Sequence, residues 1–181
     1  MNAIKASRSK IRPRTQQRSE QTLEAILDSA EALIAQKGYA ATSVSEVSRI
    51  AGVTIGALYG RFENKEALLE GLFDRLCEQT QCVFEQLWVD LAADTLEFRR
   101  ALERSMEAMG WIYSERSVLV SAVNQAAVTN PALRKRILAF NQSICARLYR
   151  ELGRYADEIR HPQPALAMKL GHEGLSLDPC G

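Results

Sequence analysis

This sequence lacks long apolar runs, clustered cysteines and a targeting segment, and each absence removes a class of protein. No apolar run approaches the roughly 20 residues that a helix needs to cross a bilayer, so no membrane partner is expected. The basic N-terminus is not followed by an apolar stretch, so it is not predicted to be a secretory signal. The cysteines show no C-x-x-C or zinc-ligand spacing (Cys77, Cys82, Cys145 and Cys180). Free thiols in the cytoplasm are therefore expected.

The chain is also poor in the residues that enzymes use. Its two histidines, His161 and His172, stand beside proline or glycine, and no Ser/His/Asp arrangement or metal-ligand spacing includes them. The segment from Gly56 to Gly60 lacks the lysine and the preceding strand of a phosphate-binding loop. We therefore predict no catalytic residue, no metal site and no cofactor, and we do not expect an enzyme.

The chain has enough apolar residues to form a hydrophobic core, and its charged residues are unevenly distributed. The 181 residues are 46% hydrophobic and 25% charged, which suits one or two globular domains. Residues 1–19 carry six basic and no acidic side chains, whereas residues 20–181 carry 17 basic and 22 acidic ones. Residues 1–19 are thus predicted to form a flexible basic arm that binds a polyanion. A solvated tail with no partner is the alternative.

Apolar residues recur at helical spacing along the rest of the chain, and no segment shows sustained period-two alternation. An amphipathic helix is predicted from Thr22 to Lys37, with Gly38 as the left-handed residue that ends it. Ser43 and Glu46 have the spacing of a capping box for a second, short helix. Thr54 can cap a third helix that runs to about Phe62.

The pattern in the second half of the chain also predicts helices. A long helix is predicted from residues 64–65 to about 88, and another over residues 98–113 with its large apolar residues on one side. A shorter helix spans residues 118–128, and Asn130-Pro131 begins the next, because proline is favoured at a first helical position. After a turn at residues 161–164, a last segment is expected over residues 165–175. The predicted fold class is all-α.

Residues 43–62 have the proportions of a helix-turn-helix, with the turn at Ala51-Gly52-Val53-Thr54. In such a motif the second helix enters the major groove of DNA while the first crosses the backbone. Leu58 and Phe62, four residues apart, are predicted to face inward, which leaves the remaining side chains of the second helix outside. A purely structural three-helix bundle is the alternative. Two glycines in one short helix are costly in helix propensity, which favours close approach to DNA.

The stretch ILDSAEALIAQKGYAATSVSEVSRIAGVTIGALYGRFENKEALLEGL resembles the DNA-binding domain of the TetR/AcrR-type (tetracycline repressor-like) family of bacterial transcriptional regulators. The features that match are KGY at the end of the first helix, TSV, AGV at the turn, GALY, and F-x-N-K-E-A-L-L. The resemblance implies a DNA-binding domain over residues 20–79 and a helical domain for effector binding and dimerisation over residues 80–181. The latter is expected to be shortened at its C-terminus by one to two helices.

By position, the resemblance implies that nine residues contact a double-stranded, palindromic operator. Phosphate contacts fall on Thr42, Tyr59 and Lys65, and base-proximal positions fall on Thr54, Ile55, Gly56, Ala57 and Arg61. Gly60 is the ninth DNA-binding position. Among the positions near the bases, Arg61 has the one side chain that can bind a guanine edge with two hydrogen bonds. Because Ile55 and Ala57 offer only apolar contact, specificity is expected to depend on Arg61, backbone contacts and DNA shape.

The resemblance also implies a pocket for a small, largely apolar effector within the C-terminal helices. Its candidate lining is Phe98, Met106, Met109, Trp111, Tyr113, Asn124, Gln125 and Phe140. Methionine and aromatic residues adapt to varied apolar ligands, although a stripe of them at helical spacing forms a core far more often than a pocket.

The sequence thus predicts a ligand-responsive repressor, a homodimer acting on the bacterial nucleoid in the cytoplasm. The alternative is a helical interaction protein, a truncated or dead-end dimer partner without operator binding of its own.

Overall fold

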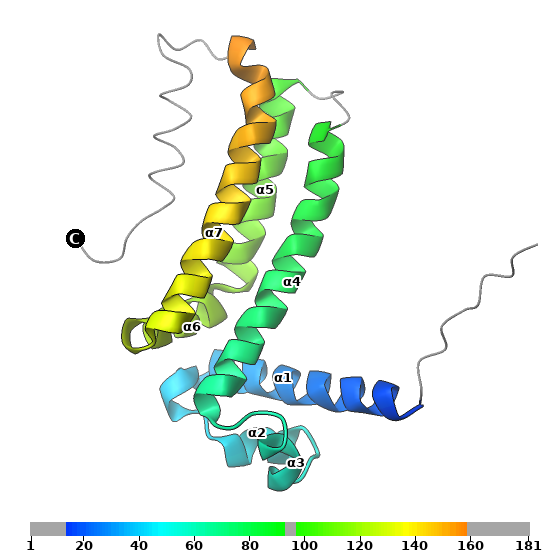
Figure 1. Ribbon diagram of the computed structural model, residues 1–181, viewed down its shortest axis with the longest axis vertical. Helices are drawn as coiled ribbons and strands as arrows, with labels where there is room; N and C mark the ends of the chain where they lie inside the picture. The colour runs from blue at the N-terminus through cyan, green and yellow to red at the C-terminus, as the bar shows by residue number, and fades with distance from the viewer. Residues whose placement is uncertain (1–13, 93–96, 159–181) are drawn as a thin grey trace, which may run out of the picture. The chain divides into compact units, whose positions relative to one another are not determined.

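The computed structural model describes residues 14–92 and 97–158, and over these residues every regular element is helical (Figure 1). Seven α-helices and one 3-10 helix occupy this part of the chain, which confirms the predicted all-α class. None of the helices in these two ranges is both long enough and apolar enough to cross a membrane. The turn and helix predicted over residues 161–175 lie outside the described residues.

The first helix, α1 (Arg14–Ala41), begins eight residues before the predicted start at Thr22. The added turns, RTQQRSEQ, carry no apolar stripe, but Arg, Gln and Glu are good helix formers. Residues 14–19 of the predicted arm are therefore helical. Gly38 has φ +82°, which confirms it as the left-handed residue. After this kink the helix continues for three more residues.

Two short helices follow, α2 (Val44–Ile50) and α3 (Ile55–Tyr59). Their predicted caps are confirmed. Ser43 and Glu46 form a reciprocal capping box at the start of α2, and the Thr54 hydroxyl accepts a hydrogen bond from the Ala57 N–H at the start of α3. The helix α3 ends at Tyr59, earlier than the predicted Phe62. Gly60 has low helix propensity, and the next N–H, that of Arg61, bonds to the Leu58 carbonyl in a tighter turn.

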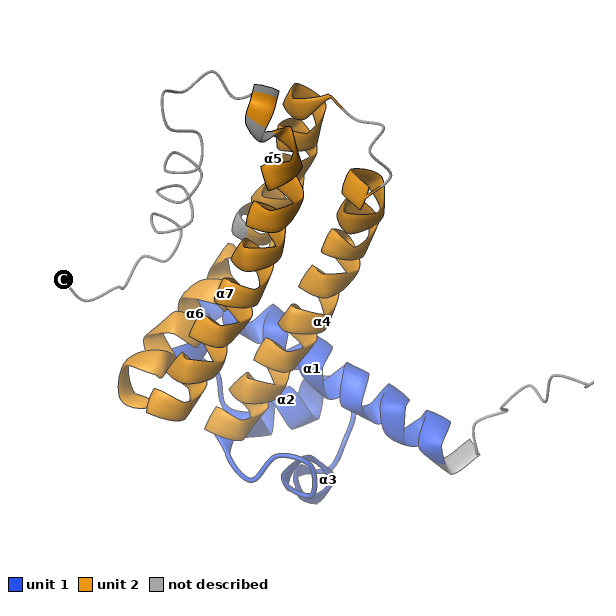
Figure 2. Cartoon of the chain, turned by 45° about the horizontal axis from the view of Figure 1, so that its top comes forward, with its two compact units in different colours: residues 1–65 blue, residues 66–181 orange. Residues whose placement is uncertain are grey.

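The chain forms two compact units, residues 1–65 and residues 66–181 (Figure 2). In the first unit, α1 supplies most of the buried apolar side chains, and the two short helices add one each. The buried residues are Ile26, Leu27, Ala30, Leu33, Ile34, Val47, Leu58 and Phe62. This small core fixes α2 and α3 against α1.

The second unit is a bundle of long helices. It contains nearly all of α4 (Lys65–Ala92) together with α5 (Phe98–Glu115), α6 (Ser117–Thr129), α7 (Pro131–Leu152) and a 3-10 helix, η1 (Gly153–Glu158). As predicted, α7 begins with an Asn130 cap, whose side-chain oxygen accepts from the Leu133 N–H at 3.0 Å, and with Pro131 in the first turn.

The face of α5 that is buried differs from the predicted one. The predicted stripe of large residues includes Leu102 and Met106, and both are exposed, Met106 by 67%. The buried face instead carries the small residues Ala101, Ser105 and Ala108. Small side chains at i, i+4 and i+7 let a helix pack closely on its neighbours, and counting large apolar residues does not detect such a face. The core of this end of the unit comprises Phe84, Leu87, Trp88, Leu91, Ala101, Ala108 and Tyr155.

Candidate functional site

In the first unit, residues 43–62 form two capped helices joined by a tight turn. The Val53 N–H bonds to the Ser48 carbonyl at 3.0 Å, and Gly52 in the turn has φ +67°, a backbone conformation that favours glycine. Leu58 is fully buried and Phe62 nearly so, as predicted. The turn and these two anchors set the orientation of α3 within the unit.

One face of α3 is left uncovered. Ile55 and Tyr59 are 46% and 50% exposed, although both are large and largely apolar. The other exposed residues of this segment are Thr54, Gly56, Ala57, Gly60 and Arg61. A short helix that buries one side chain and exposes its neighbours is suited to contact a partner rather than to stabilise the fold.

The two glycines of this segment are not equivalent. A Cβ built on Gly60 would lie 3.3 Å from the Gly56 carbonyl oxygen, so the chain itself disfavours a larger residue there. A Cβ on Gly56 would meet nothing within 4 Å. Packing within the chain therefore does not require a glycine at position 56, and close approach of a partner to this backbone is a reason for having one.

Two of the expected phosphate contacts already have partners within the chain. Thr42 is buried, and its hydroxyl donates to the Gly38 carbonyl at 2.9 Å. Its own N–H donates to the Tyr39 carbonyl at 3.1 Å. Both donors thus hold the end of α1 in the chain without DNA, and the contact of Thr42 with a phosphate stays a prediction. Lys65 lies at the same junction, where its Nζ donates to the Ala40 carbonyl at 3.1 Å and sits 4.4 Å from the centre of the Tyr39 ring.

Arg61 has an arrangement that the sequence did not indicate. Its Nη2 donates to the Ser19 carbonyl at 2.9 Å and to the Ser19 hydroxyl at 3.0 Å. These bonds join the segment after α3 to the first turns of α1. No motif signals them, because the two residues are 42 positions apart and Ser19 lies in a stretch without apolar periodicity.

The capping box of α2 is part of a charged group. The Glu46 carboxylate accepts from Lys37 Nζ at 2.6 Å and from the Ser43 hydroxyl at 2.7 Å. The hydrogen bond from Lys37, followed by that from Ser43, lowers the pKa of Glu46 to about 2. The carboxylate therefore stays ionised at neutral pH and ties α1 to the start of α2.

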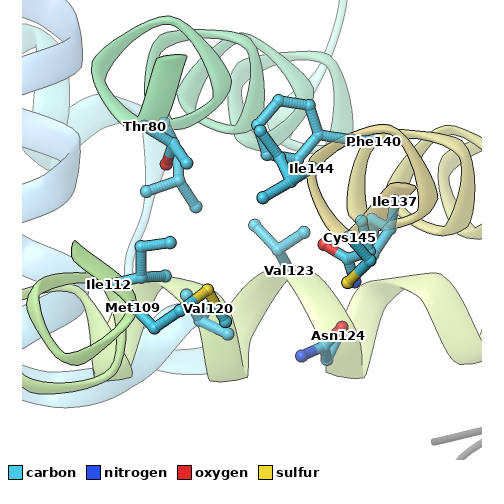
Figure 3. A pocket seen from close by; sticks show the side chains of 12 residues that line it. Thr80, Met109, Ile112, Val120, Val123, Asn124, Ile137, Phe140, Ile144 and Cys145 are labelled. Carbon is cyan, nitrogen blue, oxygen red and sulfur yellow. The ribbon is translucent and has the colours of Figure 1, made fainter. Parts of the chain in front are cut away.

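The second unit holds a cavity of about 140 Å³ between its helices (Figure 3). Its lining is mostly apolar, with contributions from α4, α5, α6 and α7. The lining residues are Leu76, Thr80, Met109, Ile112, Val120, Val123, Asn124, Ile137, Phe140, Asn141, Ile144 and Cys145. Desolvation raises the pKa of the Cys145 thiol, so this sulfur is uncharged at neutral pH.

Three of the eight predicted effector contacts line this cavity: Met109, Asn124 and Phe140. The others do not. Phe98 packs against the core cluster around Trp88, Trp111 lies under the Arg116 guanidinium, and Met106 and Gln125 are exposed. The side chain of Tyr113 lies outside the described residues. Sequence reasoning missed the lining residues of α4 altogether, although Thr80, a polar residue four positions after Leu76 on an apolar stripe, was a usable signal.

Beside the cavity, α4 and α7 are bridged by charged side chains. Arg136 donates to Glu70 at 3.1 Å and also pairs with Asp74, and its guanidinium lies 5.5 Å from the centre of the Phe73 ring. Glu70 also accepts from the Asn130 amide at 3.0 Å. The next residue, Ile137, lines the cavity, so this bridge and the cavity share one turn of α7.

Comparison with known proteins places this arrangement among regulators. Residues 26–72 match the family described as bacterial regulatory proteins, tetR family. The HTH-type transcriptional regulator TtgR of Pseudomonas putida is 37% identical over 65 residues, which are 36% of this chain and 31% of TtgR. The fatty acid metabolism regulator protein of Bacillus subtilis is 31% identical over 120 residues, 66% of this chain and 56% of that protein. The chain thus spans about a third to just over half of these two relatives.

The similarity in structure extends further along the chain. The crystal structure of NalD, the secondary repressor of the MexAB-OprM multidrug efflux pump in Pseudomonas aeruginosa, superposes with a TM-score of 0.60 and 29% sequence identity. The aligned part covers 88% of this chain and 84% of NalD, and so includes the helices after the matched domain. Over residues 26–72 the chain thus matches the tetR family of bacterial regulatory proteins, and its fold beyond that domain is similar to that of the repressor NalD.

Proposed function

We propose that this chain is a sequence-specific DNA-binding transcriptional regulator, a repressor that a small, largely apolar effector releases from its operator. The observation that carries the proposal is the exposed face of α3. Leu58 anchors this helix in the core while Ile55 and Tyr59 remain about half exposed beside Gly56 and Ala57. Two of the similar proteins, TtgR and NalD, are by name a transcriptional regulator and a repressor.

In this proposal residues 20–79 bind DNA, residues 80–181 bind the effector and pair with a second copy, and the dimer acts on the bacterial nucleoid. The operator is palindromic, because two identical α3 helices about one turn of DNA apart, roughly 34 Å, read two identical half-sites. Apolar side chains on α3 contact thymine methyl groups, Arg61 contacts a guanine, and the basic residues before α1 add contacts to phosphates.

The cavity of the second unit supports the effector part of the proposal. Four helices line it, so an occupant that suits one arrangement of these helices better than another shifts the equilibrium between the two. The Arg136 bridge between α4 and α7 is a contact that one of these two arrangements would keep and the other would break. Because binding of DNA and binding of effector are then coupled, each weakens the other by the same factor.

The test is selection of bound duplexes from a random-sequence pool by the full chain, followed by sedimentation equilibrium of the complex. The proposal predicts enrichment of one palindromic sequence and a mass of two chains per duplex. Failure to enrich any sequence would contradict it. If the chain nevertheless associated with itself, the result would favour a helical interaction protein instead.

A further inference from the structure

Thr80 of α4 is a polar residue in the wall of the apolar cavity. It is 1% exposed, and in the part of the chain that the structure describes its hydroxyl oxygen has no hydrogen-bond partner. Figure 3 shows this oxygen on the side of α4 that faces the cavity, opposite Ile112 and Val123. Buried hydroxyls are nearly always paired, so an unpaired one beside a cavity points to a partner that enters from the cavity.

The helix itself offers Thr80 an alternative that it does not use. Serine and threonine in helices often donate to the carbonyl four residues earlier, and in α5 of the same unit Ser105 does so, with a 2.7 Å bond to Ala101. Thr22 and Ser29 in α1 make the same kind of bond. Thr80 therefore keeps its hydroxyl group unpaired in surroundings where a local bond is possible.

The size and chemistry of the cavity define which molecules could pair with the Thr80 hydroxyl. An apolar protein cavity of about 150 Å³ accommodates benzene, and this cavity has about 140 Å³. All of its lining side chains are uncharged, so a charged ligand would be buried without an opposite charge. Leu76, Ile112 and Val123 belong to the apolar part of the lining, and the amides of Asn124 and Asn141 belong to the lining at α6 and α7.

We propose that the cavity binds an uncharged, largely apolar molecule of about the size of benzene that carries one hydroxyl or carbonyl oxygen, and that Thr80 pairs with this oxygen. The role of such a molecule as an effector rests on the proposed function, whereas its binding does not. Thr80 acts as a specificity residue: it separates oxygen-bearing ligands from hydrocarbons of the same shape. An oxygen-bearing ligand gains a hydrogen bond with the Thr80 hydroxyl that a hydrocarbon cannot make, because this hydroxyl has no partner in the ligand-free chain.

The test measures binding of phenol and of toluene, which have nearly the same size, to the full chain by titration calorimetry. Thr80→Val keeps the shape of the side chain and removes the hydroxyl, and Thr80→Ser is the matched control that keeps it. Thr80→Val should weaken phenol binding about fivefold, the usual effect of losing one hydrogen bond, and leave toluene binding unchanged or slightly stronger. Thr80→Ser should retain the preference of the unchanged chain for phenol.

A second readout guards against a structural role of Thr80. Since the hydroxyl has no partner in the ligand-free chain, Thr80→Val should leave the Tm unchanged or raise it. A lower Tm, equal effects of Thr80→Val on phenol and toluene, or no phenol binding by the unchanged chain would each overturn the proposal. None of these assays contains DNA, so they test the binding of the ligand and not its role as an effector.

The effector role is tested separately by adding phenol to the chain bound to a selected operator. If phenol binds through Thr80 but does not release the operator, the effector role is refuted and the proposed ligand class still holds.

Discussion

The contact between Arg61 and Ser19 leads to a prediction about DNA recognition. A guanidinium grips a guanine edge with two N–H groups, either Nη1 and Nη2 or Nε and Nη2, so Nη2 takes part in both arrangements. In this chain Nη2 donates to the carbonyl and the hydroxyl of Ser19. Arg61 must therefore release Ser19 before it can bind a guanine with two hydrogen bonds.

The size of the effect follows from these two bonds. A bidentate contact with guanine is worth about 1–3 kcal/mol, and each hydrogen bond given up at this exposed site costs about 0.5–1.5 kcal/mol. Ser19→Ala removes one of the two competing bonds and leaves the carbonyl. It should therefore strengthen binding to a guanine-containing operator by about 2- to 10-fold.

The assay is a double-mutant cycle of Ser19→Ala and Arg61→Ala, measured by fluorescence anisotropy on an operator selected with the unchanged chain. Arg61→Ala alone should weaken binding and relax the preference at one base pair. In the Arg61→Ala background Ser19→Ala should have no effect, because no guanidinium remains to be released. The reasoning would be refuted if Ser19→Ala weakened binding, or if its effect were the same with and without Arg61.

Three further predictions concern stability and reactivity. The folded-state pKa of Glu46, about 2, lies below the ordinary value of 4.5, so the stabilising effect of its carboxylate is present above pH 4.5 and lost as the pH falls toward 2. Glu46→Gln should therefore show a smaller fall in Tm than the unchanged chain from about pH 6 to about pH 3, and an equal fall would count against this. Arg136→Ala should destabilise the second unit by only about 1 kcal/mol, because the ion pairs of Arg136 are partly exposed. A double-mutant cycle with Asp74→Ala, measured by chemical denaturation, should detect coupling between the two residues. Strictly additive losses of stability would speak against the bridge. Desolvation by burial and the nearby charge of Asp74 raise the pKa of the Cys77 thiol to about 12. Cys77 should therefore react with iodoacetamide at pH 8 far more slowly than the exposed Cys82. Equal rates would contradict the raised pKa.

The sequence predicted the local features of this fold well because they depend on neighbouring residues. The capping box of Ser43 and Glu46, the Thr54 cap and the left-handed Gly38 each involve residues within a few positions of one another, and the structure confirms all three. The inward orientation of Leu58 and Phe62 also follows from spacing alone.

The features that the sequence did not predict depend on packing between distant segments. The bond of Arg61 to Ser19 spans 42 positions, and nothing in either neighbourhood indicates it. The cavity was only partly predicted, because five of the eight candidate lining residues were large residues of α5. The buried face of that helix is formed by small residues, so Met106 is exposed and Met109 faces the cavity. Thr80 was missed because no residue of α4 was considered for the pocket.

The most direct test of the central claim, that α3 reads DNA, is the affinity of Ala57→Glu for a selected operator. Ala57 is the third residue of α3, and glutamate there completes a capping box with Thr54, so the variant should fold at least as well as the unchanged chain. Its carboxylate would face the phosphates and base edges of DNA. Gln125→Glu, at an exposed position of α6, makes the same change in charge elsewhere and is the control.

Ala57→Glu should cost about 2 kcal/mol or more, roughly a 30-fold loss of affinity, while Gln125→Glu should change affinity less than about twofold. Equal affinities of Ala57→Glu and the unchanged chain, with the fold intact by circular dichroism, would show that α3 does not face DNA and would contradict the account.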